Sequence, residues 1–321
     1  MSQSKHRLFI SLKWLVMLAA YGFLIYKLAN IEFWIELKRS FLAINAERTV
    51  FLAAVLLLMP LNWMLEVRKW QVLSSNSVQL SFNDSLKAVL AGLNTGFITP
   101  NRIGEFAGRI LFLPDNHRLT GIILSFINSL TQTVVMTFLG VIGAVFYFSR
   151  FYAPADYSVY LVWIVIGIVL CLLLYFAFPG LIQKIKSNEW SVKLQQAVKS
   201  LSSFKTTDLM VILIISMLRY VVFSLQFYFM LKFFQIDITL SEAIIAIPAM
   251  YLLVTYTPSF AASEPAIRGS YAVLIFSVFS NNVIGIMLAG VLIWLINFVI
   301  PMLAGSVVIL KTKSSGFVPK N

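Results

Sequence analysis

Thr-Pro-Asn-Arg-Ile-Gly-Glu-Phe-Ala-Gly-Arg occupies residues 99–109 of this 321-residue chain, and Thr-Pro-Ser-Phe-Ala-Ala-Ser-Glu-Pro-Ala-Ile-Arg occupies residues 257–268. Each stretch holds a Thr-Pro pair and, further on, a glutamate four positions before an arginine; neither pattern occurs elsewhere in the sequence. Both stretches are embedded in long apolar segments. A charged, helix-breaking motif that occurs twice at membrane depth is typical of transporters built from structural repeats.

The composition predicts a membrane protein. The chain is 60% hydrophobic and only 12% charged, whereas soluble domains are about a quarter charged. Several segments carry no charge at all: 49–65, 119–149, 157–183, 243–263 and 269–310. Since a membrane-spanning helix needs about 20 apolar residues, the fold class that we expect is an all-α polytopic membrane protein.

The apolar segments and the proline breaks predict six spanning helices and two re-entrant helical hairpins. We place the helices at about 8–28, 49–72, 119–148, 157–178, 208–233 and 283–310, and the hairpins at about 80–114 and 241–279. Pro100 and Pro258 cannot continue a helix. Each half, 1–150 and 151–321, then has three crossings and one hairpin. Three is odd, so the second half enters from the opposite face, and we predict one membrane domain made of two inverted repeats.

The net charge of +12 indicates topology rather than nucleic-acid binding, because cytoplasmic loops collect lysine and arginine. The positive residues cluster where the predicted helices end inside: Lys5, Arg7, Lys13, Arg68, Lys69, Lys87, Lys184, Lys311 and Lys313. We therefore expect a plasma-membrane protein with both termini in the cytoplasm. Lys186, Lys193, Lys199 and Lys205 recur every six or seven residues, which fits either an amphipathic helix on anionic lipid or an ordinary positive loop.

The sequence contains no recognisable catalytic or metal-binding pattern. The chain has one cysteine, Cys171, and two isolated histidines, His6 and His117, so we predict no transition-metal site. It contains no Gly-x₄-Gly-Lys-[Ser/Thr] phosphate loop and no nucleophile–base constellation. We expect no cofactor, no catalytic residues and no enzymatic activity.

The repeated motif predicts an anion site. A new helix should begin after each break, with Asn101 and Ser263 as N-caps, and helix N-termini attract phosphate or carboxylate. Arginine adds a planar guanidinium group that can donate hydrogen bonds to two oxygens of one phosphate or carboxylate. The predicted substrate-binding residues are therefore Arg102, Glu105, Arg109, Glu264, Arg268, Arg219, Asn94 and Asn101, with Thr99, Pro100, Thr257 and Pro258 as hinge residues.

Two interpretations of the charged pairs stay open. Glu105/Arg109 and Glu264/Arg268 each lie four positions apart with the acid first, which favours an ion pair on one helix face. The pairs either hold the broken helix together or line a cavity in which the arginines contact a ligand. Arg219 lies in the first half of helix 208–233, and its side chain either reaches the inner membrane surface or lines the same cavity.

These residues resemble a known family. Gly92-Leu-Asn94-x₄-Thr99-Pro100-Asn101-Arg102-Ile-Gly104-Glu105-x₃-Arg109 is similar to the first signature of the lysylphosphatidylglycerol synthase transmembrane-region family, also described as flippase-like. Two further elements resemble its other signatures: Asn62-Trp63-x₄-Arg68 and Pro258-Ser-x₄-Glu264-x₃-Arg268-Gly269. The chain departs from the family in two ways: it has no soluble aminoacyltransferase domain, and Phe260-Ala261-Ala262 stands where a glycine-rich turn is usual.

The resulting hypothesis is a flippase-like membrane transporter. It would bind an anionic phospholipid or a lipid-linked headgroup and move it between leaflets, with a lipid-synthesis enzyme as a candidate partner and no nucleic acid. Two alternatives belong to other classes. One is a membrane enzyme, or an enzyme's membrane subunit, that uses Glu105 or Glu264 as a general acid or base. The other is a scaffold for a lipid-synthesis complex.

Overall fold

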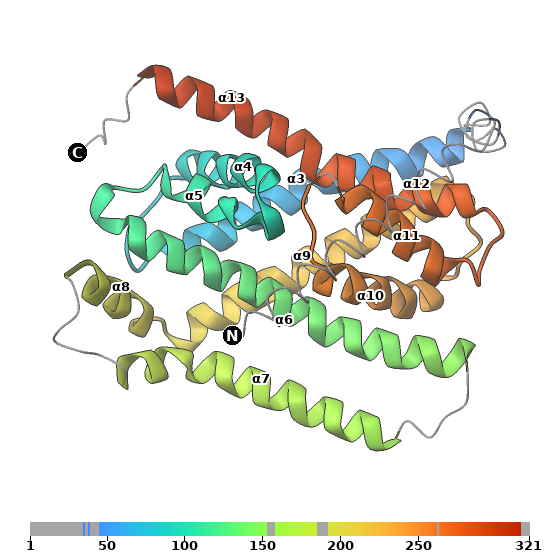
Figure 1. Ribbon diagram of the computed structural model, residues 1–321, viewed down its shortest axis with the longest axis horizontal. Helices are drawn as coiled ribbons and strands as arrows, with labels where there is room; N and C mark the ends of the chain where they lie inside the picture. The colour runs from blue at the N-terminus through green and yellow to red at the C-terminus, as the bar shows by residue number, and fades with distance from the viewer. Residues whose placement is uncertain are drawn as a thin grey trace, which may run out of the picture. The chain divides into compact units, whose positions relative to one another are not determined.

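The computed structural model describes residues 35, 38, 45–152, 158–184, 192–261 and 263–315. The regular elements of these ranges are all helical (Figure 1): α3 (Ala46–Ser74), α4 (Phe82–Ile98), η1 (Pro100–Arg102), α5 (Gly104–Ile110), η2 (Asp115–His117), α6 (Arg118–Phe151), α7 (Ser158–Lys184), α8 (Val192–Ser202), α9 (Thr206–Phe233), α10 (Leu240–Tyr256), α11 (Glu264–Phe276), α12 (Val283–Trp294), η3 (Leu295–Val299) and α13 (Ile300–Ser315). The predicted all-α fold class is confirmed.

Five segments of the described chain are long and apolar enough to cross a membrane: Ala46–Ser74, Asp115–Phe151, Val162–Lys184, Thr206–Phe233 and Val283–Leu310. They correspond to the last five of the six predicted spans. The predicted first span, at about 8–28, lies outside the described residues. The last span is not one regular helix, because the π-helical turn η3 joins α12 to α13.

The chain folds into two compact units, and each draws on both halves of the sequence. Of the described residues, those within 60–138, 154–222 and 300–315 form the α5 unit, and those within 35–59, 139–152 and 223–299 form the α11 unit. Each unit holds one helical hairpin, α4–α5 or α10–α11. The predicted division into repeats at residue 150 is a different partition and stays a prediction.

In the α5 unit, α4 packs closely against α5 and α13 (Figure 1). Glycines make this approach feasible. A Cβ atom on Gly108 of α5 would lie 2.4 Å from the Ala91 carbonyl oxygen of α4, and one on Gly305 of α13 would lie 2.1 Å from the Leu90 carbonyl oxygen. At Gly92 of α4 a Cβ would meet the Arg109 side chain at 2.9 Å. The short helix α5 is therefore held against α4 at a fixed register, which positions Arg109.

Replacing Gly108 by alanine should destabilise the first hairpin. The added methyl group would lie 2.3 Å from Thr95 Oγ1 and 2.4 Å from a backbone oxygen, and overpacking of this kind costs about 1–3 kcal/mol. Gly167→Ala is the matched control, because nothing lies within 4 Å of that position on α7 and alanine favours a helix by about 1 kcal/mol. Thermal unfolding of the purified protein measures both. Equal unfolding midpoints for the two variants would contradict the close α4–α5 contact.

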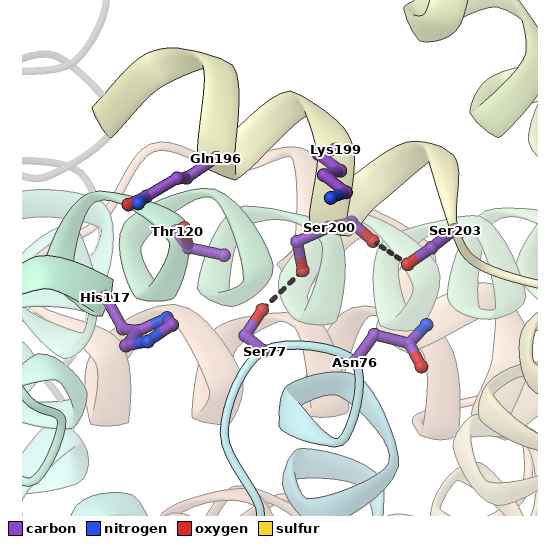
Figure 2. Close-up of a pocket in the computed structure, with 8 residues that line it drawn as sticks. All are labelled: Asn76, Ser77, His117, Thr120, Gln196, Lys199, Ser200 and Ser203. Carbon is purple, nitrogen blue, oxygen red and sulfur yellow. Dashed lines mark hydrogen bonds between the residues drawn. The ribbon is translucent and has the colours of Figure 1, made fainter. Parts of the chain in front are cut away.

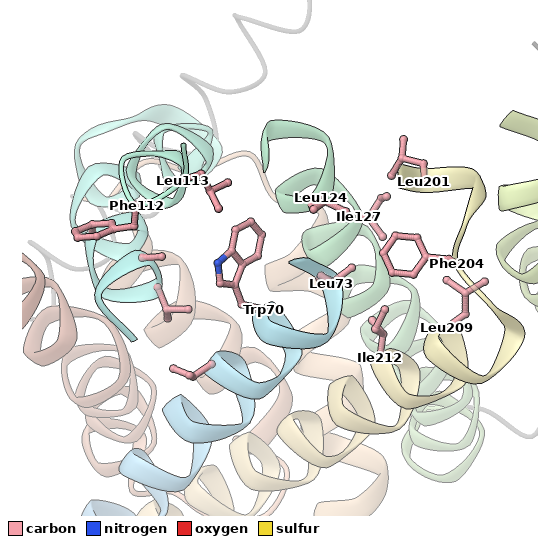
Figure 3. Close-up of a cluster of buried hydrophobic side chains, with 14 of the residues drawn as sticks. Trp70, Leu73, Phe112, Leu113, Leu124, Ile127, Leu201, Phe204, Leu209 and Ile212 are labelled. Atoms are coloured by element: carbon pink, nitrogen blue, oxygen red, sulfur yellow. The ribbon is translucent and has the colours of Figure 1, made fainter. Parts of the chain in front are cut away.

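The core of the α5 unit also contains α8 (Figure 3). Leu201 of α8 and Phe204, just beyond it, lie with Trp70, Leu124 and Ile127 in one cluster of buried apolar side chains. Residues 192–202 thus form a helix that holds Lys193 and Lys199, whereas Lys205 lies beyond it and Lys186 lies outside the described residues; its contact with anionic lipid stays a prediction. Its apolar face packs into the protein.

In the α11 unit, α11 packs between α10 and α12. Thr239 begins α10 with a reciprocal capping box, in which its side chain accepts from the Glu242 N–H and the Glu242 carboxylate accepts from the Thr239 N–H. A Cβ on Gly290 of α12 would lie 2.8 Å from the Arg268 carbonyl oxygen, so α11 and α12 also approach closely. This contact brings α12 and η3 to the side of α11 that carries Glu264 and Arg268.

Candidate functional site

The first break is held by two threonines. α4 ends at Ile98, and Thr99 is extended (φ −110°, ψ 147°), as the Thr-Pro pair predicts. The Thr99 hydroxyl accepts a hydrogen bond from the Gly104 N–H at 2.7 Å, and the Thr95 hydroxyl donates to the Gly104 carbonyl at 2.7 Å. Both ends of the break are therefore tied by side chains in place of the missing helical hydrogen bonds.

Asn101 does not cap α5, contrary to the sequence-based expectation. It lies inside η1 with φ 50°, and the neighbouring Arg102 has φ 58°. α5 begins after Ile103, which makes no side-chain cap. Asparagine tolerates the left-handed region because its short side chain bonds locally, but arginine there is uncommon. The chain thus turns sharply after Pro100, and this turn sets the direction in which α5 leaves the break.

Glu66 of α3 is the centre of a buried charge cluster in the α5 unit. Its Oε1 atom accepts hydrogen bonds from Arg109 Nη2 of α5 and, at 2.8 Å, from Asn128 Nδ2 of α6. The same Arg109 nitrogen also bonds Glu105 Oε1, so the predicted pair within α5 exists. The Arg109 guanidinium lies 5.1 Å from the centre of the Trp70 ring, a distance at which cation and ring attract.

Arg219 of α9 completes the cluster from another side. Its Nη1 atom forms an ion pair with Glu66 Oε2, and its Nε atom donates to Asn62 Oδ1 at 3.0 Å. Gln132 Oε1 of α6 lies 3.4 Å from the same Nη1 atom. The Arg219 side chain is directed into the protein, not at the membrane surface: it is 15% exposed and contacts the Glu66 carboxylate.

Lys69 of α3 is the third basic side chain of the cluster. It is fully buried, and its Nζ atom donates to the Asn128 carbonyl at 2.8 Å. It lies within electrostatic range of Glu66, Arg109 and Arg219. Asn62, Glu66 and Trp70 of the same helix are likewise buried.

The cluster holds more basic than acidic side chains. Three basic side chains (Lys69, Arg109 and Arg219) face two carboxylates (Glu66 and Glu105) among the described residues of this cluster. Arg109 is 1% exposed, and its Nη1 atom has no hydrogen-bond partner in the described part of the chain. Buried charges are costly unless they are paired, and one guanidinium nitrogen of this cluster stays without a hydrogen-bond partner among the described residues.

The second break has a related arrangement in the α11 unit. α10 ends at Tyr256, and Thr257 is extended (φ −85°, ψ 117°). The Thr257 hydroxyl donates to the Leu253 carbonyl at 2.8 Å and shares a 2.8 Å hydrogen bond with the Tyr271 hydroxyl of α11. Ser263 precedes α11 without a side-chain cap, against expectation; its hydroxyl accepts from the Phe260 N–H at 3.1 Å.

Glu264 and Arg268 lie together on α11, as the spacing predicts. Arg268 Nε lies 3.7 Å from Glu264 Oε2, and the same oxygen accepts a 2.9 Å hydrogen bond from Trp294 Nε1. The Arg268 guanidinium lies 5.1 Å from the centre of the Phe298 ring in the π-helical turn η3. π-turns often occur at functional sites, and here the turn places an aromatic face beside the cation. This pair is balanced, one cation to one carboxylate.

The predicted site residues are therefore divided between the two units. Glu105, Arg109 and Arg219 meet in the α5 unit, whereas Glu264 and Arg268 meet in the α11 unit. Asn94 is apart from the charges: its amide donates to the Met302 carbonyl at 3.2 Å and to Ser306 Oγ at 2.6 Å, which ties α4 to α13. Asn101 and Arg102 form the turn described above. The hinge role of Thr99, Pro100, Thr257 and Pro258 stays a prediction.

Sequence reasoning missed most of the polar partners in the cluster: Asn62, Glu66, Lys69, Asn128 and Gln132. A signal was present. Asn62, Glu66 and Lys69 recur at i, i+4 and i+7, which places them on one helical face. Asn128 and Gln132 repeat the i, i+4 spacing inside a segment without charges. Polar residues that share one face of a membrane-spanning helix indicate a buried polar contact rather than a lipid-facing surface.

Comparison with known proteins adds one match. The sequence model of a family described as "Lysylphosphatidylglycerol synthase TM region" matches residues 10–305. No curated protein and no solved structure matches the chain.

Proposed function

Because the chain belongs to the lysylphosphatidylglycerol synthase transmembrane-region family, we propose that it binds an anionic phospholipid or a lipid-linked headgroup and moves it between membrane leaflets. Membership makes the chain an integral membrane protein of lipid modification or transport. Beyond membership, we propose that the ligand is an anion and that the activity is its transport between leaflets.

The observation that carries the proposal is the excess of basic side chains over carboxylates around Glu66. A carboxylate that bridges two arginines would by itself be a structural ion pair. The third cation, Lys69, has no carboxylate partner among the ion pairs of the described residues and is fully buried. A phosphodiester carries one negative charge and would neutralise this excess. It would also accept from the Arg109 Nη1 atom, since arginine binds phosphate oxygens readily.

The second break supports translocation rather than binding alone. Helix breaks at membrane depth are tolerated where they are buried or face a water-filled cavity, and this chain has two of them, each with a threonine, a glutamate and an arginine in the same order. Inverted-repeat transporters use such paired breaks to alternate access to a central site. On this account both hairpins take part in one transport cycle.

Lys69→Gln tests the proposal at its charge excess. The substitution keeps a hydrogen-bond donor for the Asn128 carbonyl and makes the cluster neutral, two cations to two carboxylates. We expect the fold to be retained and the retention of anionic phospholipid, measured by native mass spectrometry of the purified protein, to weaken about tenfold or more, since hydrogen bonds to charged groups contribute about 1.5–3 kcal/mol.

Lys87→Gln is the matched control for this experiment. Lys87 is an exposed lysine of α4 whose Nζ atom lies 3.4 Å from Asp84, outside the cluster. Its loss should leave lipid retention unchanged. If Lys69→Gln retains phosphatidylglycerol as tightly as wild type and Lys87→Gln, the buried charge excess does not recruit the lipid and the proposal fails.

The location and the partner follow from the same proposal. We infer a plasma-membrane protein with both termini in the cytoplasm, because positive residues favour that side of a membrane. A lipid-synthesis enzyme that supplies or consumes the transported lipid is the partner that we expect. Cysteine accessibility on a Cys171→Ser background tests the topology: a probe at residue 154 should react from outside, and labelling from the cytoplasmic side would contradict it.

A further inference from the structure

A polar cavity of 330 Å³ lies beneath α8 (Figure 2), and none of its lining residues belongs to the charge cluster. Its lining comes from three places in the α5 unit: the turn that follows α3, the η2–α6 junction and one face of α8. The lining residues are Asn76, Ser77, His117, Thr120, Gln196, Lys199, Ser200 and Ser203. Neither hairpin contributes to it, so this cavity is separate from the residues considered so far.

The face of α8 that lines the cavity is polar. Gln196, Lys199, Ser200 and Ser203 follow the i, i+3, i+4, i+7 spacing of one helix face. The opposite face packs into the core through Leu201. A short hydrogen bond joins Ser200 Oγ to Ser77 Oγ across the cavity, and Ser203 Oγ donates to the Ser200 carbonyl at 2.7 Å (Figure 2). The Ser77–Ser200 contact ties α8 to the turn after α3, so distant parts of the chain hold the lining together.

The chemistry of the lining selects an anion that also carries hydroxyl groups. None of the described residues that line the cavity is a carboxylate, and Lys199 supplies a positive charge. Thr120 and the serines offer hydroxyls, and Asn76 and Gln196 offer amides, all of which both donate and accept. The volume is at the small end of the range for ligand pockets, about 300–1,000 Å³. It suits a headgroup or a small phosphate ester rather than acyl chains.

We propose that this cavity binds the phosphate ester of a polyol, such as the glycerophosphate headgroup of an anionic phospholipid. Lys199 pairs with the phosphate, and the amides and hydroxyls bind the polyol. Lysines near a membrane surface attract anionic headgroups. The proposal rests on the chain being a membrane protein and does not require that it transports lipid.

The test is native mass spectrometry of the full chain with phosphatidylglycerol, in neutral phosphatidylcholine nanodiscs. Lys199→Gln should weaken the retention of one phosphatidylglycerol molecule about tenfold, the ratio that a loss of about 1.4 kcal/mol produces. Lys205→Gln, an exposed lysine six positions on that does not line the cavity, is the control and should retain that molecule. The double variant Lys69→Gln/Lys199→Gln should lose a second one, which separates this site from the charge cluster.

The source of the ester is settled by adding glycerol phosphate to the buffer. If it displaces the lipid at concentrations near the lipid's own dissociation constant, the site takes a soluble ester; if millimolar amounts leave the lipid bound, the site takes a lipid headgroup. Equal weakening in Lys199→Gln and Lys205→Gln would mean general surface attraction and would overturn the proposal. So would wild-type retention in Lys199→Gln.

Discussion

Replacing Glu66 by glutamine should destabilise the protein by about 3–5 kcal/mol, the usual cost of removing one partner from a buried ion pair. Glu66 is 5% exposed and bonds Arg109, Arg219 and Asn128. Glutamine keeps the shape and removes the charge, which leaves three buried cations facing Glu105 alone. The thermal unfolding midpoint of the purified protein measures the loss.

Glu47→Gln is the matched control for this substitution. Glu47 lies on the same helix, in its first turn, and is exposed. Its loss removes only a favourable contact with the helix dipole, about 0.3–1 kcal/mol. A second variant, Glu66→Gln/Lys69→Gln, lowers the cations to two and should recover part of the stability. Equal midpoints for Glu66→Gln and Glu47→Gln would show that Glu66 is not the counter-charge of the cluster.

Glu105→Gln and Glu264→Gln should each reduce leaflet exchange of an anionic lipid by roughly ten- to a hundredfold. Each carboxylate contacts the arginine of its own break, and hydrogen bonds to charged groups contribute about 1.5–3 kcal/mol, with about 1.4 kcal/mol for each factor of ten in rate. A transporter that alternates between two states needs both breaks. Exchange in proteoliposomes, with Asp115→Asn as a control at an exposed carboxylate, measures the effect.

This pair of variants also separates transport from enzymatic chemistry. An enzyme with a single reactive carboxylate should lose its activity with one substitution and tolerate the other. Loss in only one of the two variants, with both proteins folded, would therefore favour the membrane-enzyme alternative with that glutamate as a general acid or base. Loss in neither would favour the scaffold.

The fold was readable from the sequence where one physical constraint dominates. Apolar length alone predicted the spans of the described chain, and Pro100 and Pro258 marked the breaks because proline ends a helix. The ends of α4 and α10 fall beside the Thr-Pro pairs accordingly. The close α4–α5 contact was less accessible, because a glycine in a sequence does not reveal which backbone approaches it.

The sequence predicted the contacts of the candidate site within one helix but not those between helices, because residue spacing indicates only local pairs. Glu105 and Arg109 are four positions apart on one helix, and their ion pair followed from that spacing. Their bond to Glu66 depends on where α3 lies, which no local pattern contains. Lys69 shows the same limit: it adjoins Arg68 in the sequence, but a helix turns by about 100° per residue, so Arg68 is exposed and Lys69 is buried.

The most direct test of the central claim is leaflet exchange by the wild-type protein in liposomes. Fluorescently headgroup-labelled phosphatidylglycerol is placed in both leaflets, the outer label is quenched chemically, and the lipids are analysed afterwards by mass spectrometry. The account predicts that protein makes the inner label accessible, and that the lipids are chemically unchanged. Inner label that stays protected in the presence of folded protein, or new lipid products that require the protein, would contradict it.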